Sequence, residues 1–240
     1  IETLSGIEWT GIDDVEYVRN KMMAALKIPK AFLGYEAELC VRKNTKVPLL
    51  SGITKTVEDL IKDYENGIKN YVYSIDETTK NIVPGEIEWA GWTRKNAQLV
   101  RVWLDNDKYI DCTPDHNFMT RDGQWIEAKD LKENQSLMPL YLKKTTRKDR
   151  KNYEMVYHPQ NENYQEVHRL VAEHYSLIKR GCGKVVHHKD FNKLNNYPEN
   201  FDCSMTFWEH KKYHSQLNKM GINSPENIQK RVNDPLWRKS

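Results

Sequence analysis

The stretch VRVWLDNDKYIDCTPDHNFMTRDGQWIEAKDL, residues 100–131, decides the fold. Its runs of Val, Ile, Tyr and Trp are short, and turn signals such as Asp105-Asn106 and Asp122-Gly123 separate them. Short β-rich runs bounded by turn residues are typical of antiparallel strands and hairpins. The stretch therefore predicts a compact, mostly β domain.

The same pattern extends outward over residues 40–140. Similar runs are CVRKNTKVPLL (40–50), NYVYSID (70–76) and EIEWAGW (86–92), with Pro84-Gly85 as a further turn signal. One helix is expected at 56–67, and it should end at Gly67 because glycine favours the residue just after a helix.

Helical patterns flank this β-rich region. Residues 13–27 place apolar side chains on one helical stripe, and residues 141–165 are polar and basic, which predicts a linker. Helices are expected again at 167–180 and 206–217, on either side of a loop rich in Asn and His, and at 224–232.

Composition limits the class of protein. Hydrophobic residues make up 38% and charged residues 30% of the 240 residues, which is typical of a soluble globular chain. No apolar run approaches the ~18 residues of a membrane span. We therefore expect a cytoplasmic protein without a membrane partner. Four cysteines without a CxxC pair predict neither a zinc ribbon nor a disulfide framework.

Charge is unevenly distributed, although the net charge is only +3. Residues 1–39 carry seven carboxylates against four basic side chains, whereas basic residues are densest at 143–151 and in the last thirty residues. Such basic patches could contact phosphates, and a solvated surface is the more ordinary interpretation.

The densest chemistry lies in KVVHHKDFNKLNNYPENF (184–201) and EHKKYH (209–214). His210 and His214 are four residues apart, so both rings lie on one face of a helix and can reach one metal ion. The neighbours His187 and His188 point in opposite directions if they end a strand, so one can bind metal while the other faces substrate. An isolated HxxxH would indicate only a surface helix. The combination predicts a metal site.

These motifs, with HRLVAEHYSL before them, resemble an HNH endonuclease of the ββα-metal fold over about residues 165–217. The resemblance implies that His188 is the general base toward a scissile phosphate and that Asn200 holds the loop presenting it. His187 and His210 would be metal ligands, and His214 an additional one. A divalent cation, with Mg²⁺ the expected ion, and double-stranded DNA follow as cofactor and partner. Asp190 would lie either in the metal shell or in a solvated turn.

The run from CVRKNTKVPLLSGITKTVEDL (40–60) through TPDH (113–116) to SLMP resembles an intein, a self-splicing Hint domain, over about residues 40–140. The resemblance implies that the Cys40 thiol attacks the carbonyl of Leu39. His116 would donate a proton to the leaving nitrogen, and Thr113 with nearby backbone N–H groups would polarise the scissile carbonyl. Cys112 is interpreted as a buried core residue.

Residues 1–39 would then be an extein, and IDDVEYVRNKMMAALKIPKAFLGYE (12–36) resembles the portal protein of large tailed phages. An ordinary helical leader packed on the β domain is the alternative. A terminal His-Asn block is not found near Ser240. The chain is therefore expected to be a truncated reading frame or the N-terminal half of a split intein, with a separate C-terminal half as its partner.

The resulting prediction is an α+β protein in five parts. These are the extein (1–39), a β-rich Hint module (40–140), a basic linker (141–165), a small ββα-metal HNH module (166–217) and a basic helical tail (218–240). The intein would spread by cutting intein-less copies of its host gene in an infected cell. Three alternatives stay open: a free-standing HNH nuclease whose β-rich half recognises DNA, a Hint domain that cleaves without ligating, and a structural phage protein with a decayed insertion.

Overall fold

The computed structural model describes residues 40–94, 96–147 and 151–219. The helices expected at 13–27 and 224–232, the extein and most of the basic tail lie outside these ranges. The described part is β-rich with few helices, as the sequence predicted.

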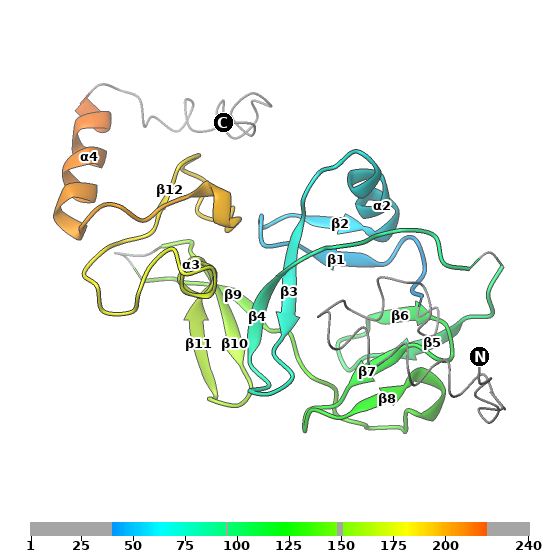
Figure 1. Cartoon of the computed structure of the whole chain (residues 1–240). Coiled ribbons are helices and arrows are strands. Elements are labelled where there is room, and N and C mark those ends of the chain that lie inside the picture. The colour runs from blue at the N-terminus through cyan, green and yellow to red at the C-terminus, as the bar shows by residue number, and fades with distance from the viewer. Residues whose placement is uncertain (1–39, 95, 148–150, 220–240) are drawn as a thin grey trace, which may run out of the picture.

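Four consecutive antiparallel hairpins build the first half, and Figure 1 shows them from blue to green. Their strands are β1 (Lys46–Pro48), β2 (Thr54–Thr56), β3 (Tyr71–Ile75), β4 (Ile82–Glu86), β5 (Val100–Trp103), β6 (Tyr109–Cys112), β7 (Asn117–Met119) and β8 (Trp125–Glu127). A short 3-10 turn, η2 (Ala128–Asp130), follows β8.

The helix α2 (Val57–Glu65) confirms the prediction for 56–67. Thr56 and Asp59 form a reciprocal capping box in which each side chain accepts from the other's backbone N–H. This arrangement satisfies N–H groups that have no partner inside the helix. Gly67 follows the helix with a φ of +69°, a conformation that glycine adopts without steric cost.

The expected turn at Pro84-Gly85 is wrong, because both residues lie inside β4. Pro84 pairs with Tyr73 and Gly85 with Val72. Within the described chain β4 pairs with β3 alone, so the N–H that proline lacks is tolerated on such an edge strand. EIEWAGW, expected to be a strand, contributes only Glu86 to one.

The linker expected at 141–165 is also wrong, because this segment forms a three-stranded antiparallel sheet. Its strands are β9 (Leu142–Lys144), β10 (Glu154–His158) and β11 (Asn163–Glu166), with β10 in the centre. Val156 in β10 is fully buried. The many basic residues of the segment concealed the alternation of buried and half-buried positions at 156–158.

The last part of the described chain contains α3 (Val167–His174), β12 (His187–His188), the 3-10 turn η4 (Pro198–Asn200), β13 (Phe201–Asp202) and α4 (Phe207–Lys219). β12 and β13 form a short antiparallel pair, His187 opposite Asp202 and His188 opposite Phe201. Among the described residues, no helix is long and apolar enough to cross a bilayer.

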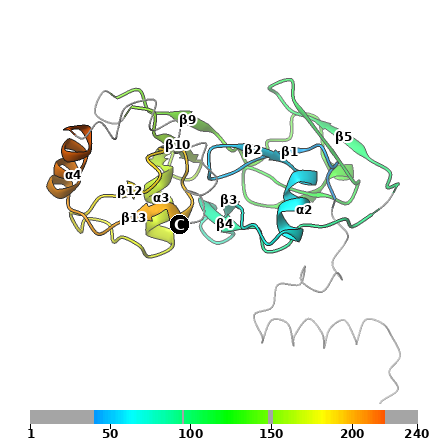
Figure 2. The same cartoon turned by 90° about the horizontal axis from the view of Figure 1, so that it is seen from above.

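One hydrophobic cluster joins residues near β1, β3 and β4 to the second half. Leu50, Tyr71 and Ile82 from the first half pack with buried residues of the second half, namely Val156, Val167, Val171, Ala172, Ile178, Val186 and Phe201. Figures 1 and 2 both show the β3–β4 hairpin between the other hairpins and the region of α3 and β9–β11. The expected boundary at residue 140 therefore does not separate two cores.

Candidate functional site

Cys40 lies beside β6, at the start of the described chain. Val41 forms an antiparallel bridge with Cys112, so Cys40 faces Thr113 and Arg42 faces Asp111. The N–H of Thr113 donates to the carbonyl of Cys40 at 2.9 Å, and the N–H of Arg42 donates to the carbonyl of Asp111 at 2.8 Å. Residues 40–42 thus continue the β5–β6 sheet as a short third strand.

The Thr113 hydroxyl contacts both backbone polar atoms of Cys40. Its Oγ1 accepts from the Cys40 N–H at 3.4 Å and donates to the Cys40 carbonyl oxygen at 3.4 Å. The side chain of Thr113 is fully buried, and a hydrogen bond from its hydroxyl is the largest cause of the lowered pKa of Asp115, so that carboxylate is a further partner of the hydroxyl. The carbonyl of Leu39, which Cys40 is expected to attack, lies outside the described residues.

His116 reaches this site through Thr113. The backbone N–H of His116 donates to the Thr113 carbonyl at 3.0 Å, and the imidazole ring packs edge-on against Phe118. Its Nδ1 is buried and makes no hydrogen bond with the described residues. Burial lowers the pKa of His116, although Asp115 beside it opposes the shift. The ring is therefore neutral at pH 7, with one N–H and one lone pair available.

Cys112, the buried neighbour of Thr113, has no exposed surface. Burial raises the pKa of its thiol to about 11. A thiol in this state is a poor nucleophile, because the thiolate is the reactive form.

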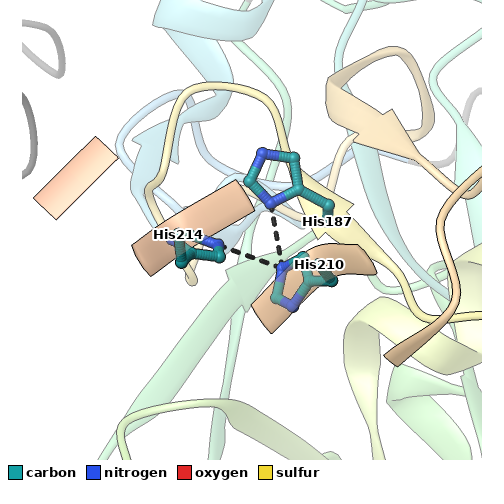
Figure 3. Close-up of side chains that lie close together, drawn as sticks. All are labelled: His187, His210 and His214. Carbon is teal, nitrogen blue, oxygen red and sulfur yellow. Dashed lines mark hydrogen bonds between the residues drawn. The ribbon is translucent and has the colours of Figure 1, made fainter. Parts of the chain in front are cut away.

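The structure brings His187, His210 and His214 together (Figure 3). The contacting atoms are Nδ1 of His187 and Nε2 of His210 at 3.1 Å, and Nε2 of His214 and Nε2 of His210 at 3.0 Å. His187 comes from β12, and the other two come from successive turns of α4. The short β12–β13 pair therefore places its histidine against the face of α4 that carries the i, i+4 pair.

Electrostatics favours neutral rings in this trio. Burial, followed by His214 and His210, lowers the pKa of His187 to about 4. Burial also lowers the pKa values of His210 and His214. Neutral imidazoles offer lone pairs to a cation, and one Nε2 atom of His210 cannot satisfy two ring nitrogens with its single proton or lone pair. The trio therefore fits a metal ion.

His188 points to a different environment. Its Nε2 contacts Oδ1 of Asn196 at 3.2 Å, and its ring packs against Phe201, His168 and Tyr153. Burial lowers its pKa to about 4. If Nε2 carries the proton given to Asn196, Nδ1 is the basic nitrogen. The side chains of His187 and His188 therefore point to opposite sides of β12, as the sequence predicted for neighbouring residues at the end of a strand.

Asn200 braces the loop rather than His188 itself. Its amide accepts from the N–H of Asp190 and donates to the carboxylate of Asp190 and the carbonyl of Asn195, at 2.9–3.1 Å. The Asp190 carboxylate also accepts from the side chain of Asn195 and the N–H of Asn192. Asp190 thus ties the loop together.

Sequence reasoning missed Asn196. Its side chain is 1% exposed, and its N–H donates to the carbonyl of Leu50 in the first half of the chain at 2.7 Å. The only sequence signal was the doubled Asn195-Asn196 within an Asn-rich loop, which does not show which amide is buried. The pairing of Arg42 with Asp111 was also missed, because nothing in the sequence links positions so far apart.

The backbone of Cys40 thus lies against the buried Thr113 of the TPDH loop. The chain belongs to the intein splicing domain family, whose model matches residues 47–231. That match begins after Cys40 and runs through the histidine clusters. Protein splicing, a rearrangement of the chain's own peptide bonds, is the activity of this family.

Curated proteins similar to this chain are much longer. The chain is 38% identical over 179 residues to a subunit of DNA gyrase from Synechocystis sp., covering 70% of this chain and 16% of that protein. It is 32% identical over 117 residues to reverse gyrase of Methanocaldococcus jannaschii, covering 48% of this chain and 7% of that protein. The chain thus spans less than a fifth of the length of either relative.

Proposed function

We propose that Cys40 begins splicing by an N–S acyl shift at the Leu39–Cys40 peptide bond. The contact of Thr113 Oγ1 with the amide nitrogen of Cys40 carries this proposal. That nitrogen is the leaving group of the step, so a polar side chain fixed beside it acts on the reacting atoms.

The step balances without a co-reactant. The Cys40 sulfur loses its proton and bonds to the Leu39 carbonyl carbon, the bond from that carbon to the Cys40 nitrogen breaks, and the nitrogen gains a proton. A neutral His116 can accept the thiol proton with its lone pair and supply one to the nitrogen. Thr113 and the strand pairing hold the peptide in place, which reduces the entropic part of the barrier.

A thiol reagent tests this proposal. Dithiothreitol should release a fragment ending at Leu39, because exchange with the thioester traps it. Mass spectrometry of the intact mixture identifies that fragment. Cys40→Ala should release none. Cys112→Ala changes the neighbouring buried cysteine, and we expect it to keep the release. Equal release from the protein and from Cys40→Ala would reject Cys40 as the nucleophile.

We propose a second activity, metal-dependent cleavage of DNA of the HNH type. The convergence of three imidazoles on one point favours it. Imidazole donors suit Zn²⁺, Ni²⁺ or Co²⁺ better than Mg²⁺, which prefers oxygen ligands, so we propose a transition metal in place of the expected Mg²⁺. Bound there, the cation would stabilise charge on a phosphate. His188, held by Asn196, would accept a proton from water through Nδ1.

The nuclease proposal is tested with double-stranded DNA and added divalent metal. His188→Ala should bind DNA and fail to cut it, whereas the exposed His174→Ala should cut as the parent does. His210→Ala should also lose binding of Zn²⁺ measured by calorimetry, a result that does not depend on cutting. Cutting by His188→Ala would contradict the role of general base.

The biological setting of these activities is also a proposal. Residues 1–39 would be the flanking extein of a portal-like host protein, and the DNA substrate would be the allele of that gene without the insertion. Cutting of that allele, compared with an allele that contains the insertion, tests the DNA target, because only the uninterrupted site should be cut.

A further inference from the structure

Asp111 connects the nucleophile strand to the sheet through its side chain as well as its backbone. Its carboxylate is 8% exposed and accepts from the guanidinium groups of two arginines. Arg42 Nη1 lies 3.1 Å from Oδ2, while Arg101 binds in a bidentate manner at 2.7 and 3.0 Å. Arg42 is two residues after Cys40, and Arg101 lies on β5, directly opposite Asp111.

Several contacts hold the Arg101 side chain in place. The Arg101 guanidinium lies 3.8 Å from the ring centre of Tyr109, and Arg101–Asp111 and Trp103–Tyr109 are both cross-strand pairs. A planar guanidinium that binds a carboxylate with two parallel hydrogen bonds fixes its orientation. The Arg101 hydrogen bonds, followed by that of Arg42, lower the pKa of Asp111 to about 2. The carboxylate is therefore charged at neutral pH.

Within the part of the chain that the structure describes, few other contacts hold residues 40–42 to the sheet. Two backbone hydrogen bonds, Arg42 to Asp111 and Thr113 to Cys40, flank the Val41–Cys112 bridge, and after Arg42 the chain turns toward α2. Three-residue edge pairings are marginal on their own. A charged side-chain contact at one end of this pairing restrains the strand from sliding or lifting away from β6.

We propose that Asp111 is a positioning residue for the acyl shift, acting through Arg42 to hold the amide nitrogen of Cys40 against Thr113 Oγ1. It does not touch the reacting atoms. Register makes the link direct, because Arg42 faces Asp111 two positions along the same pairing in which Cys40 faces Thr113. A shift of about 1 Å at a reacting group can cost ~10²-fold in rate. The inference rests on the proposed role of Cys40.

The two arginines give matched variants with opposite expectations. Arg42→Met removes the link to the nucleophile strand and leaves the bidentate Arg101 pair, so it should slow thiol-induced release by about tenfold or more with little loss of thermal stability. Arg101→Met removes the stronger contact inside the sheet and should lower the melting temperature more while affecting release less. Asp111→Asn should resemble Arg42→Met in rate. Glu86→Gln, which breaks the exposed Lys69–Glu86 pair, should change neither.

The experiment measures fragment release from the full chain as a function of dithiothreitol concentration, together with the melting temperature. Poor positioning slows formation of the thioester, so the rate at saturating thiol should fall while the thiol concentration for half-saturation stays constant. A purely structural role would instead make the rate follow the melting temperature across the variants.

Four results are decisive. A saturating rate for Arg42→Met that equals the parent's overturns the positioning role, and so does a larger rate loss in Arg101→Met than in Arg42→Met. Lack of release from the parent, or release from Cys40→Ala, contradicts the role of Cys40 and removes the role of Asp111 with it. If Asp111→Asn fails to fold, the comparison of the two arginine variants still decides.

Discussion

Thr113 combines two functions in one buried side chain. Its N–H fixes the Cys40 carbonyl, and its hydroxyl contacts the Cys40 amide nitrogen. An isosteric change separates these functions, because Thr113→Val keeps the backbone and the volume and removes only the hydroxyl. A preorganised hydrogen bond at a reacting group is worth roughly 10²–10³-fold in rate. The hydroxyl should therefore matter more for the reaction than for the fold.

We expect Thr113→Val to release the Leu39 fragment at least ~10²-fold more slowly in dithiothreitol, and Thr113→Ser to stay within about tenfold of the parent. Thr120→Val is the matched control, since it removes another buried hydroxyl, bonded to Asp122 and Gln124 in the β7–β8 turn. Thr120→Val should lower the melting temperature without slowing release. Equal rates for Thr113→Val and Thr113→Ser would contradict the role of the hydroxyl.

The buried histidines predict how stability depends on pH. His187 and His188 have folded-state pKa values of about 4, below the unfolded value of about 6.5. Between these values the unfolded chain binds more protons, so the free energy of unfolding falls as pH falls. Without metal, the melting temperature should decline from pH 6.5 toward pH 4.

The melting temperature of His188→Gln should decline less steeply over the same pH range, because one of the two histidines with a lowered pKa is gone. The scan is run in EDTA, since a bound cation would itself compete with protons. A melting temperature that stays constant or rises from pH 6.5 to 4.5 would show that these rings are not held neutral by burial.

Among the elements, the turn between β1 and β2 packs against the Asn-rich loop. Gly52 has a φ of +76°, and a Cβ there would lie 2.6 Å from the Cβ of Leu194 and 2.9 Å from its carbonyl oxygen. Gly67, after α2, has a similar φ of +69° with no atom within 4 Å of the same position. The two glycines therefore share a positive φ, which would strain any residue with a Cβ, and they differ in what that Cβ would contact.

Gly67→Ala should lower the free energy of unfolding by ~1–2 kcal/mol, the cost of a positive φ for a residue with a Cβ. Gly52→Ala should cost a further ~1–3 kcal/mol from the forced contact with Leu194. Urea denaturation of both variants measures the difference. Equal losses would mean that the turn and the Asn-rich loop are not packed together as described.

Local signals predicted several elements well. The helix at 56–67 with Gly67 at its end, and the run 109–112 of β6, are visible in the sequence because they depend on neighbouring residues. Pro84-Gly85 misled because a turn signal is overridden when an edge strand tolerates proline. The strands β9–β11 were missed because basic loop residues masked one short alternation around Val156.

Contacts over long distances in the sequence could not be predicted. His187, His210 and His214 were named from their spacing, yet their convergence depends on how β12 meets α4. Asn196 and the Asp111 pair could not be found, because their partners Leu50 and Arg42 lie far away along the chain. Sequence patterns indicate which residues can do chemistry, whereas tertiary packing decides which of them meet.

For the whole molecule, the shared hydrophobic cluster and the side-chain hydrogen bonds beside it argue against separable modules before and after residue 140. Tyr71 donates to Glu199, Tyr73 donates to Glu154 at 2.6 Å, and the Tyr197 hydroxyl donates to Asn70 at 3.0 Å. Tyr71 and Glu154 are both partly buried where the two halves meet, and this burial raises the pKa values of both side chains. The region of the histidine clusters therefore forms one folding unit with the β3–β4 hairpin.

If the two halves unfold as one cooperative unit, a destabilising substitution in one half should also lower the stability of the other. Val171→Ala in α3 truncates a fully buried side chain and should cost ~1.5 kcal/mol or more. Hydrogen exchange should then become faster for the Leu50 and Tyr71 amides as well as for those of α3, because both exchange through the same global opening. Unchanged protection at Leu50 and Tyr71 would indicate independent halves.

Our central proposal, argued from the family assignment and the Cys40–Thr113 geometry, is that this fold activates one peptide bond, Leu39–Cys40. Hydroxylamine at neutral pH reports that bond, because it attacks a thioester far faster than an amide and leaves a hydroxamate on the acyl residue. We predict a single fragment, residues 1–39, with the hydroxamate on Leu39, that is lost in Cys40→Ala. A hydroxamate at another residue, or the same fragment from Cys40→Ala, would contradict the assignment.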